Sequence, residues 1–252
     1  MLRLLLIVGI LEKMKDLRLD KFIADRLGCT RKESRILIST GNVFVNGIVN
    51  KDIGSKINPS DEVIHNGKKI DYGNKYYYFI INKPGGCVTA TADNLHKTIF
   101  DLLPPYFVKL KIMPVGRLDI DTVGLLLFTN DGKLAYRLLS PKREVYKTYI
   151  AKTDKILNDN ELKKLKYGID IGDIVTKPAK IVSIDNKTYK LEICEGKFHQ
   201  VKRMFEAVGA NVIELKRTTF GPLHLDIPVG EYRELTLDEI SNLYECCNLE
   251  KK

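Results

Sequence analysis

Short strand patterns and short helix patterns follow one another along this chain without the regular strand–helix–strand rhythm of a parallel α/β sheet. The aromatic and β-branched run YYYFIIN, which starts at Tyr76, predicts a buried strand that stops at the turn sequence KPGG. We expect further strands at 124–129, 145–152, 179–184 and 188–194, and helices at 97–102, 131–139, 159–166 and 197–208. The stretch GEYREL adds a strand, and a closing helix begins near Thr236. This mixture predicts an α+β fold.

Residues 14–70 show a pattern of their own, two helices followed by small hairpins. The stretch LDKFIADRLG has apolar residues at helical spacing and ends on a glycine. Thr30 and Glu33 form a capping box for a second helix, in which Ile36 and Leu37 are expected to face inward. The stretches NVFVNGIVN and DEVIHNGKKI each predict a hairpin. The sequence therefore predicts a small separate domain.

The polar stretch DYGNK at 71–75 predicts a linker between this small domain and a larger one at 76–247. Residues 1–13 are expected to be an N-terminal extension. Their apolar run is too short to span a bilayer, and it lacks the cleavage pattern of a signal peptide. We therefore expect no membrane association.

A surplus of basic residues suggests a polyanionic partner. The formal net charge is +9, and 29% of the residues are charged, with both signs represented. Such a chain is globular with an excess of base, and nucleic acid is the first partner to test. Lysines that only maintain solubility are the alternative explanation.

Cysteine and histidine usage gives no support to a metal site. The five cysteines are odd in number and show no C-x-x-C pair, which fits the reducing cytoplasm. The four histidines are far apart in sequence, with no spacing typical of zinc ligands. We expect neither a metal nor a cofactor.

Asp119 and Asp121, in the stretch GRLDIDTVGLLLFTNDG, allow three interpretations. They could hold Mg²⁺ or Mn²⁺, although carboxylates two apart on an extended chain point to opposite faces. They could be turn and cap residues before a strand, which is the commonest use of aspartate there. In the third interpretation, one carboxylate acts alone as nucleophile or base and is kept ionised by a nearby cation.

The stretch GKFHQVKRMFEAVG offers such a cation. Its apolar residues form one helical stripe, and Lys202 and Arg203 project beside that stripe from the first turns of the helix. The positive end of the helix and these two cations would hold a nearby aspartate in its charged form. Solvated helix charges are the alternative that periodicity does not exclude.

The first part of the chain, RLDKFIADRLGCTRKESRILISTGNVFVNGIVNKD, is similar throughout to the S4 domain, a common RNA-binding module. The resemblance implies that Arg31, Lys32 and Arg35 contact RNA phosphates. Its two helices followed by a small sheet agree with the order of elements expected above.

The rest of the chain resembles the RsuA/RluB/RluE/RluF family of ribosomal-RNA pseudouridine synthases. The resemblance is carried, in chain order, by NKPGGCVT, PVGRLDIDTVGLLLFTNDG, YKTYIA, EGKFHQVKRMFEAVG, LKRTTFGPLHLD and PVGEYREL. The GRLD-x-x-T-x-GLLL-x-TNDG string is highly specific, whereas NKP-x-G alone is weak. The resemblance implies a mixed, mainly antiparallel sheet and an isomerisation of uridine to pseudouridine without cofactor or metal.

The resemblance also implies a role for individual residues. Asp119 takes the place of the catalytic aspartate, and Arg117 takes the place of the arginine that fills the RNA stack when the uridine is flipped out. Tyr149 would lie against the uracil, with Val201 beneath the base. Lys202 would pair with Asp119.

Three neighbouring positions are less specific. Lys147, two residues before the tyrosine on the same strand face, is expected to contact a phosphate. His199 and Gln200 could bind RNA or cap the helix, and they stand outside the catalytic set.

Within the family the chain most resembles the RsuA branch, whose substrate is a uridine of small-subunit 16S rRNA. We expect a cytoplasmic monomer whose partner is ribosomal RNA or a pre-ribosomal small-subunit particle. A uridine of large-subunit 23S rRNA, or an inactive relative that only binds rRNA during ribosome assembly, are the alternatives.

Overall fold

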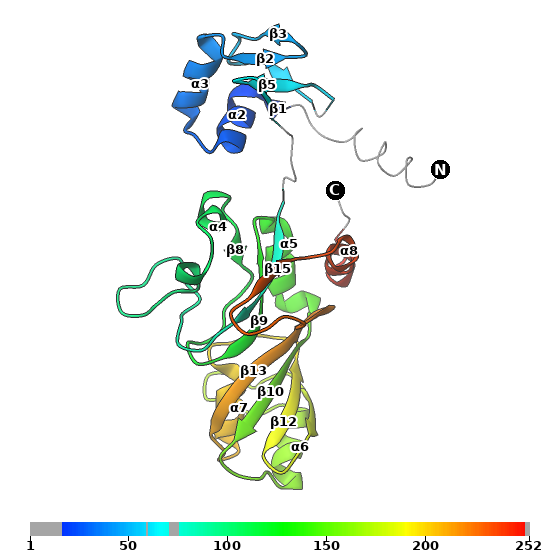
Figure 1. The fold of residues 1–252 in the computed structure, drawn as a ribbon. Coiled ribbons are helices and arrows are strands. Elements are labelled where there is room, and N and C mark those ends of the chain that lie inside the picture. Colours follow the sequence, from blue (N-terminus) through cyan, green and yellow to red (C-terminus); the bar gives the residue numbers. More distant parts are fainter. Residues whose placement is uncertain (1–16, 59, 71–75, 250–252) are drawn as a thin grey trace. The chain divides into compact units, whose positions relative to one another are not determined.

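The computed structural model describes residues 17–58, 60–70 and 76–249, and it divides the chain into two compact units at Lys75 and Tyr76 (Figure 1). The predicted extension at 1–13 and the predicted linker at 71–75 lie outside the described residues. Within the described ranges, no helix combines the length and the apolar character needed to cross a membrane.

The N-terminal unit contains two helices and small antiparallel sheets, as predicted. Its elements are β1 (Leu17–Arg18), α2 (Leu19–Leu27), α3 (Arg31–Ser39), β2 (Val43–Val45), β3 (Ile48–Val49), β4 (Lys56–Ile57), β5 (Val63–His65) and β6 (Lys68–Lys69). The strand order is β3-β2-β5-β6, and β1 pairs separately with β4. Leu19, Ile23 and Ile38 are fully buried where the helices meet the sheet.

Helix α3 begins as predicted but buries a different face. Thr30 and Glu33 form the capping box. The residues that face inward are Ser34 and Ile38, four positions apart, with Leu37 partly buried beside them. Ile36 is 52% exposed, so the prediction that it faces inward was wrong. A nine-residue helix packed on one neighbour buries one stripe, and Ile36 lies outside it.

The larger unit is built on a mixed sheet that is mainly antiparallel, as the resemblance implied. Its main path is β11-β12-β10-β13-β9-β7-β15. The strands are β7 (Tyr78–Lys83), β8 (Met113–Pro114), β9 (Val123–Thr129), β10 (Lys147–Thr153), β11 (Lys180–Ser183), β12 (Thr188–Ile193), β13 (Val212–Phe220), β14 (Leu223–His224) and β15 (Tyr232–Glu234). Among the strand pairs of the described residues, β9 with β13 is the parallel one.

Both faces of this sheet are covered, so β7 and β9 are apolar on both sides. Alternate residues enter two cores: Phe79 and Ile81 pack on one face, and Tyr78 and Ile80 on the other. The helices are η1 (Ile99–Leu102), α4 (Tyr106–Lys109), α5 (Gly132–Leu139), η2 (Pro141–Arg143), α6 (Asp159–Tyr167), α7 (Gln200–Ala207) and α8 (Leu237–Cys246). Helices α5 and α8 bury their apolar residues in one core, and α6 and α7 bury theirs in the other.

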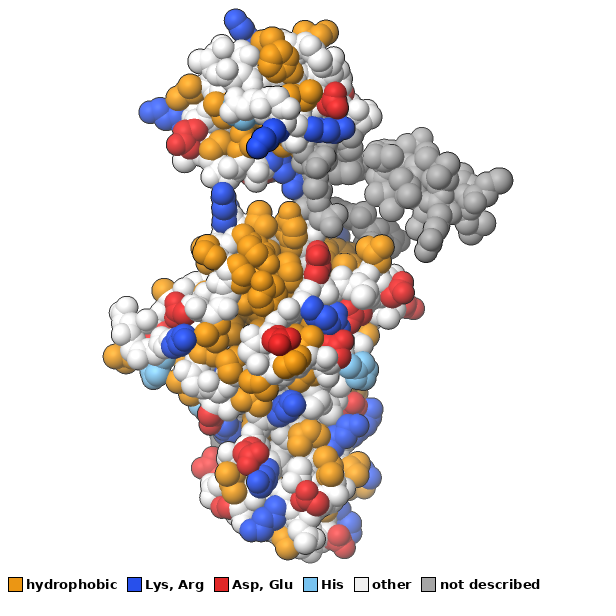
Figure 2. Space-filling view, viewed as in Figure 1, with side chains coloured by type: hydrophobic (Ala, Val, Ile, Leu, Met, Phe, Trp, Pro, Cys, Tyr) orange, Lys and Arg blue, Asp and Glu red, His pale blue; other side chains and the backbone are white. Residues whose placement is uncertain are grey.

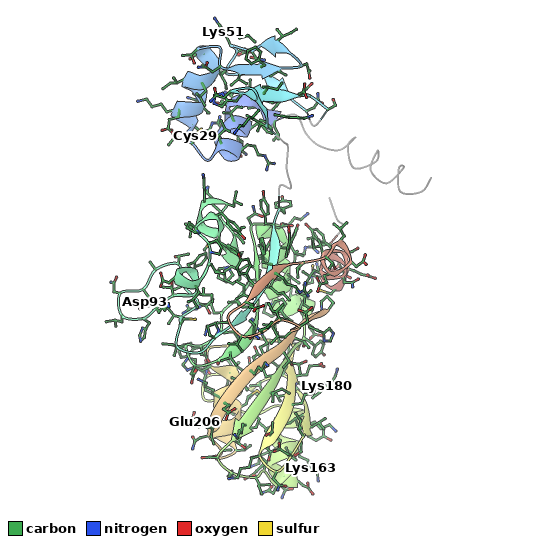
Figure 3. All side chains as sticks on the ribbon, viewed as in Figure 1. Cys29, Lys51, Asp93, Lys163, Lys180 and Glu206 are labelled. Atoms are coloured by element: carbon green, nitrogen blue, oxygen red, sulfur yellow. The ribbon has the colours of Figure 1, made fainter. Side chains whose placement is uncertain are left out.

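The amphipathic pattern of α6 and α7 is visible in the side chains. Leu165 and Phe205 are fully buried, whereas Lys163 and Glu206 lie on the exposed faces (Figure 3). A further group of apolar side chains is exposed on the surface over α4, where Tyr106 and Val108 are 37% and 57% exposed (Figure 2).

Most predicted elements of this unit are present, but two helices differ from the prediction. The predicted helix at 197–208 begins only at Gln200, and the one at 97–102 is a short 3₁₀ turn. The nine-residue strand β13 was not predicted. It lies between β10 and β9, and it forms one wall of the pocket described next.

Candidate active site

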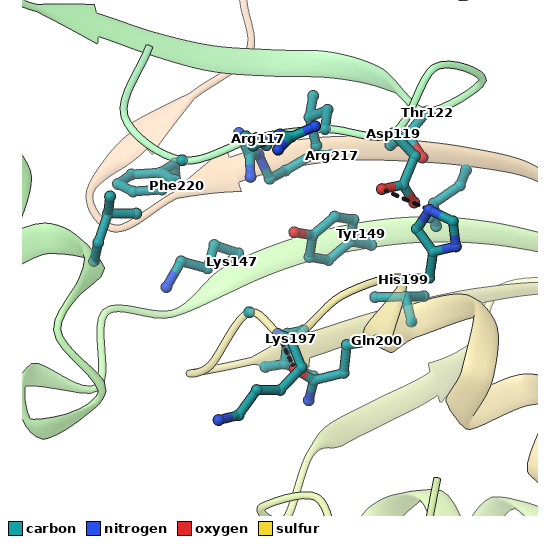
Figure 4. A pocket seen from close by; sticks show the side chains of 17 residues that line it. Arg117, Asp119, Thr122, Lys147, Tyr149, Lys197, His199, Gln200, Arg217 and Phe220 are labelled. Carbon is teal, nitrogen blue, oxygen red and sulfur yellow. Dashed lines mark hydrogen bonds and ion pairs between the residues drawn. The ribbon is translucent and has the colours of Figure 1, made fainter. Parts of the chain in front are cut away.

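One pocket of the larger unit gathers most of the residues that the sequence singled out in this unit, although Lys202 is not among its lining residues (Figure 4). Its walls are the loop before β9, the strands β10 and β13, and the loop that leads into α7. Among its lining residues are Arg117, Asp119, Lys147, Tyr149 and Val201. Segments almost a hundred residues apart in sequence therefore meet here because β10 and β9 both pair with β13.

Asp119 is partly buried, and two basic groups approach it at long range. The exposed fraction of its side chain is 26%. The Nε2 atom of His199 lies 3.6 Å from its Oδ1, and the Nζ atom of Lys202 lies 3.8 Å from its Oδ2. These distances are those of ion pairs without a short hydrogen bond. The carboxylate thus has two basic side chains beside it, and neither makes a short hydrogen bond to its oxygens.

Lys202 binds Asp121 more closely than it binds Asp119. Its amine donates to both carboxylate oxygens of Asp121, at 2.5 and 2.7 Å. Burial raises the pKa of Asp121, but the hydrogen bonds and charge of Lys202 outweigh that effect, and the pKa is lowered overall. The expected partnership of Lys202 with Asp119 is therefore the longer of two contacts.

The loop from Asp119 to Thr122 is a turn and not an extended segment. The backbone N–H of Thr122 donates to the carbonyl oxygen of Asp119 at 3.1 Å. Because of this turn, the carboxylates of Asp119 and Asp121 converge on one lysine and do not point to opposite faces. The expectation that these two carboxylates point to opposite faces of an extended segment was therefore wrong. The amine of Lys202 contacts both carboxylates. It therefore lies where a Mg²⁺ or Mn²⁺ ion would lie if the two aspartates were metal ligands.

Of the two cations predicted beside the aspartate, only Lys202 reaches it. The guanidinium of Arg203 binds the carboxylate of Asp173 and the carbonyl oxygen of Ile171. Arg203 therefore holds the segment at 171–173 against α7.

Tyr149, Lys147 and Val201 lie in the pocket wall, each less than a tenth exposed. Lys147 and Tyr149 share one face of β10 because they are two residues apart. The amine of Lys147 donates to the carbonyl oxygen of Val145 at 2.6 Å. Burial, together with the charge of Arg217, lowers the pKa of Lys147 to about 8.

Arg117 stands at the exposed edge of the pocket. It follows Gly116, whose φ of +79° favours glycine, and it precedes the buried Leu118. Figure 4 shows its side chain beside that of Arg217. Because the side chain of Arg117 is exposed, it can change its conformation without disturbing the core.

Lys83 holds the loop that carries Asp119, and sequence reasoning missed it. Its side chain is fully buried, and its amine donates to the carbonyl oxygens of Pro84, Asp119, Ile120 and Thr122 at 3.0 to 3.3 Å. Burial lowers the pKa of this lysine. The signal was the charged residue at the end of an apolar strand in NKPGG, which was interpreted only as a turn.

A second contact fixes the other end of this loop. The hydroxyl of Thr89 donates to the carbonyl oxygen of Leu118 at 2.9 Å and accepts from the backbone N–H of the same residue at 3.1 Å. The segment with Asp119 is thus held from two sides by side chains that lie 29 to 39 residues earlier in the sequence.

Gly124 allows β9 and β13 to approach each other. It has a φ of +107°, and a Cβ atom there would lie 2.2 Å from the carbonyl oxygen of Arg217. Arg217 is 3% exposed, and its Nε donates to the carbonyl oxygen of Leu125 at 2.7 Å. The glycine in GLLL therefore has a structural reason, because any other residue would separate the two strands.

The two residues left outside the catalytic set differ in role. Gln200 is buried and bridges the loop, because its amide donates to Glu195 at 2.7 Å and accepts from the backbone N–H of Lys197 at 2.8 Å. His199 makes no side-chain cap and has a φ of +48°. Its ring stacks on that of Phe198 at 3.8 Å between centroids and faces Asp119.

The basic residues predicted on α3 belong to the N-terminal unit and have a partner there. Asp20 is fully buried, and it accepts hydrogen bonds from Arg18, Arg31 and Arg35 at 2.6 to 3.2 Å. Burial raises the pKa of Asp20, but the three arginines outweigh it and lower the pKa well below its usual range. Lys32 is exposed on the same helix.

Comparison with known proteins gives two family matches. Residues 77–207 match the family described as RNA pseudouridylate synthase, and residues 17–63 match the S4 domain. The chain is 42% identical to the uncharacterized RNA pseudouridine synthase YtzG of Bacillus subtilis, over 91% of this chain and 99% of that protein.

Other relatives act on either ribosomal subunit according to their names. The ribosomal large subunit pseudouridine synthase B of Bacillus subtilis is 41% identical, over 90% of this chain and 95% of that protein. The ribosomal small subunit pseudouridine synthase A of Escherichia coli is 38% identical, over 90% of this chain and 100% of that protein. A crystal structure of a pseudouridylate synthase aligns with a TM-score of 0.63 and 38% identity, covering 90% of this chain and 99% of that one.

The fold, the pocket and these matches agree. The chain is a pseudouridine synthase that belongs to the RNA pseudouridylate synthase family and carries an N-terminal S4 domain.

Proposed function

We propose that this enzyme converts a uridine of ribosomal RNA to pseudouridine, with Asp119 as the catalytic carboxylate. The observation that carries the proposal is the position of Asp119. It lies in the same pocket as Tyr149, with His199 and Lys202 3.6 and 3.8 Å from its oxygens. An aspartate used only as a turn residue needs neither a pocket nor two basic neighbours.

The reaction is an isomerisation within one nucleotide. The bond from uracil N1 to ribose C1′ breaks, the ring rotates while it is held, and C5 bonds to C1′. Asp119 acts as a nucleophile on the nucleotide or as a base toward a ribose proton, and each role needs the ionised carboxylate. The amine of Lys202 and the imidazole of His199 lie 3.8 and 3.6 Å from the oxygens that would act.

The pocket residues are assigned to the flipped nucleotide. Tyr149 presents its ring to the uracil with Val201 beneath it, while Lys147 belongs to the same binding wall. Arg117, at the exposed edge, fills the gap that the uridine leaves in the RNA stack, because its planar cation stacks as a base does.

The N-terminal unit supplies RNA affinity. Arg31, Lys32 and Arg35 contact phosphates, and the two arginines are held in place by Asp20 while about half of each side chain remains exposed. Because most of this affinity is electrostatic, binding weakens steeply as salt rises.

The target is a uridine of small-subunit 16S rRNA, in naked RNA or in a pre-ribosomal particle, and the enzyme acts in the cytoplasm as a monomer. The sequence resemblance to the RsuA branch supports this choice, and a small-subunit synthase is among the relatives. Mapping pseudouridines in rRNA from cells that lack the protein tests it. Loss of a 23S pseudouridine in place of a 16S one would move the target to the large subunit.

Asp119→Asn tests the catalytic assignment. Single-turnover pseudouridine formation should fall to background, while RNA binding stays within about threefold, because the shape is kept and only the charge is lost. Asp159→Asn, at an exposed aspartate on α6, is the matched control and should keep full activity. Equal losses of binding and activity in Asp119→Asn would remove the catalytic role.

A further inference from the structure

Two cations lie in the part of the pocket wall away from Asp119. Lys147 on β10 and Arg217 on β13 are 7% and 3% exposed. Both face the ring of Phe220, with Lys147 Nζ at 5.4 Å and Arg217 Cζ at 5.3 Å from its centre. In Figure 4, Tyr149 lies between this group and the pair formed by Asp119 and His199.

Within the described residues, neither cation has a carboxylate at ion-pair distance. The Lys147 amine donates to a backbone carbonyl, as does the Nε of Arg217, and the Nη2 of Arg217 has no hydrogen-bond partner. The other ionisable groups that act on Lys147 are the thiols of Cys194 and Cys246. Burial raises the pKa of both thiols, to about 11 for Cys246, so they are uncharged at neutral pH.

This arrangement is costly for the folded protein. Two like charges removed from water destabilise the fold unless an anion pairs with them. The face of Phe220 compensates part of this cost, because an aromatic ring attracts cations. The rest of the positive charge of Lys147 and Arg217 would be balanced by a negative group of the bound RNA.

We propose that Lys147 and Arg217 hold the negative charge of the uracil after its bond to ribose has broken. The inference rests on the proposed function, which places the uracil against Tyr149, and it puts the ribose of the same nucleotide at Asp119. The edge of the uracil with its carbonyl oxygens then points toward Lys147. Arg217, on the neighbouring strand β13, adds its positive charge to that of Lys147.

The electrons balance as follows. When the C1′–N1 bond breaks, its electron pair leaves with the ring, and the uracil becomes a monoanion whose charge spreads over N1 and the carbonyl oxygens. When C5 bonds to C1′, that pair comes from the ring. The proton on C5 is then lost and N1 gains one, so the product is an isomer of the substrate. Fixed cations that meet the charge as it develops lower the barrier for the first step.

A phosphate of the RNA could supply the same negative oxygen, and the two sources differ in what they predict. A phosphate contact contributes to binding, so its loss weakens RNA affinity. It also makes the slope of log affinity against log salt concentration shallower by about 0.7. A contact with the detached uracil exists only after the bond has broken, so its loss lowers the rate and leaves affinity unchanged.

The test compares Lys147→Met with Lys147→Arg in the full-length enzyme. Lys147→Met should slow single-turnover pseudouridine formation by about 100-fold with RNA affinity within about threefold, and Lys147→Arg should restore most of the rate. Lys152→Met, the same change on the exposed face of β10, is the matched control and should keep its rate.

The pH profile gives a readout that a structural role would not move. The wild-type rate, divided by that of Lys147→Arg on the same RNA, should fall as pH rises through about 8, because Lys147 loses its proton there and arginine does not. The melting temperature of Lys147→Met should not drop, since the variant removes an unpaired buried cation.

Three results would overturn the inference: full activity of Lys147→Met, a loss confined to affinity, or a lowered melting temperature that accounts for lost activity. Each leaves the proposed function standing if the wild-type enzyme forms pseudouridine and Asp119→Asn does not. An inactive wild-type enzyme on every rRNA would instead remove the proposed function itself.

Discussion

Asp20 in the N-terminal unit and Asp119 in the catalytic unit both lie among basic side chains, but their oxygens are used differently. Asp20 is fully buried, and three arginines hydrogen-bond to it at 2.6 to 3.2 Å. Asp119 is 26% exposed, and its two basic neighbours stay 3.6 and 3.8 Å away. A carboxylate whose oxygens are all engaged stabilises a fold. One that is charged but not engaged can react.

Near Asp119 the close partner of the lysine is a second carboxylate. Asp121 takes the short hydrogen bonds of Lys202, which leaves Asp119 with the charge of the lysine but without its hydrogen bonds. The N-terminal unit has no such competitor around Asp20 among its described residues, because all three arginines bind the same aspartate.

The sharpest test of this comparison is stability. Asp20→Asn should destabilise the N-terminal unit by about 2 to 3 kcal/mol, less than a fully buried pair would lose because the arginines are half exposed. Asp119→Asn should change stability by no more than about 0.5 kcal/mol. Amide hydrogen exchange over residues 17–70 and 76–249 of the full-length protein measures both. Equal effects of the two variants would contradict the distinction.

The next largest expected difference between the two units is the response of their stability to acid. The folded-state pKa of Asp20 is lowered, so its stabilisation is complete above the unfolded value of about 4 and is lost as pH falls below it. We expect the N-terminal unit to lose about 2 kcal/mol in this window. Hydrogen exchange at pH 5 and pH 3 measures the loss, and Asp20→Asn should remove the pH dependence. If that variant keeps the wild-type dependence, other carboxylates are responsible.

The smallest expected effect concerns Asp121. In Asp121→Asn, Lys202 is released and pairs directly with Asp119, so the oxygens of Asp119 become engaged as those of Asp20 are. The single-turnover rate should fall by about threefold to tenfold with little change in RNA affinity. Asp121→Glu, which keeps the charge near Lys202, should restore part of the rate. A faster Asp121→Asn enzyme would show that Asp121 restrains the reaction.

Elements with strong local signals were predictable from the sequence. The capping box of Thr30 and Glu33 and the N-cap of Thr236 both stand where expected. Strand β13 was missed because charged and polar residues interrupt its apolar pattern, and its place between two strands depends on partners far away in sequence. Ile36 was misassigned because it and Leu37 are adjacent apolar residues of α3, and the sequence did not show which of the two belongs to the buried stripe of the helix.

In the site, residue identity was easier to predict than partnership. Asp119, Tyr149, Lys147 and Val201 do line one pocket. The preference of Lys202 for Asp121 depends on the turn at 119–122, which the expected extended segment did not contain. Lys83 was overlooked because its partners are backbone carbonyl oxygens, and these leave no trace in side-chain patterns.

The parallel join between β9 and β13 has a consequence for biosynthesis. Arg217 bonds to the backbone of Leu125, 92 residues earlier in the sequence, and supplies one wall of the pocket. A chain still on the ribosome cannot complete this wall until β13 has left the exit tunnel. A nascent chain that ends before β13 therefore has no complete pocket, because Arg217 is not yet present to bond to Leu125.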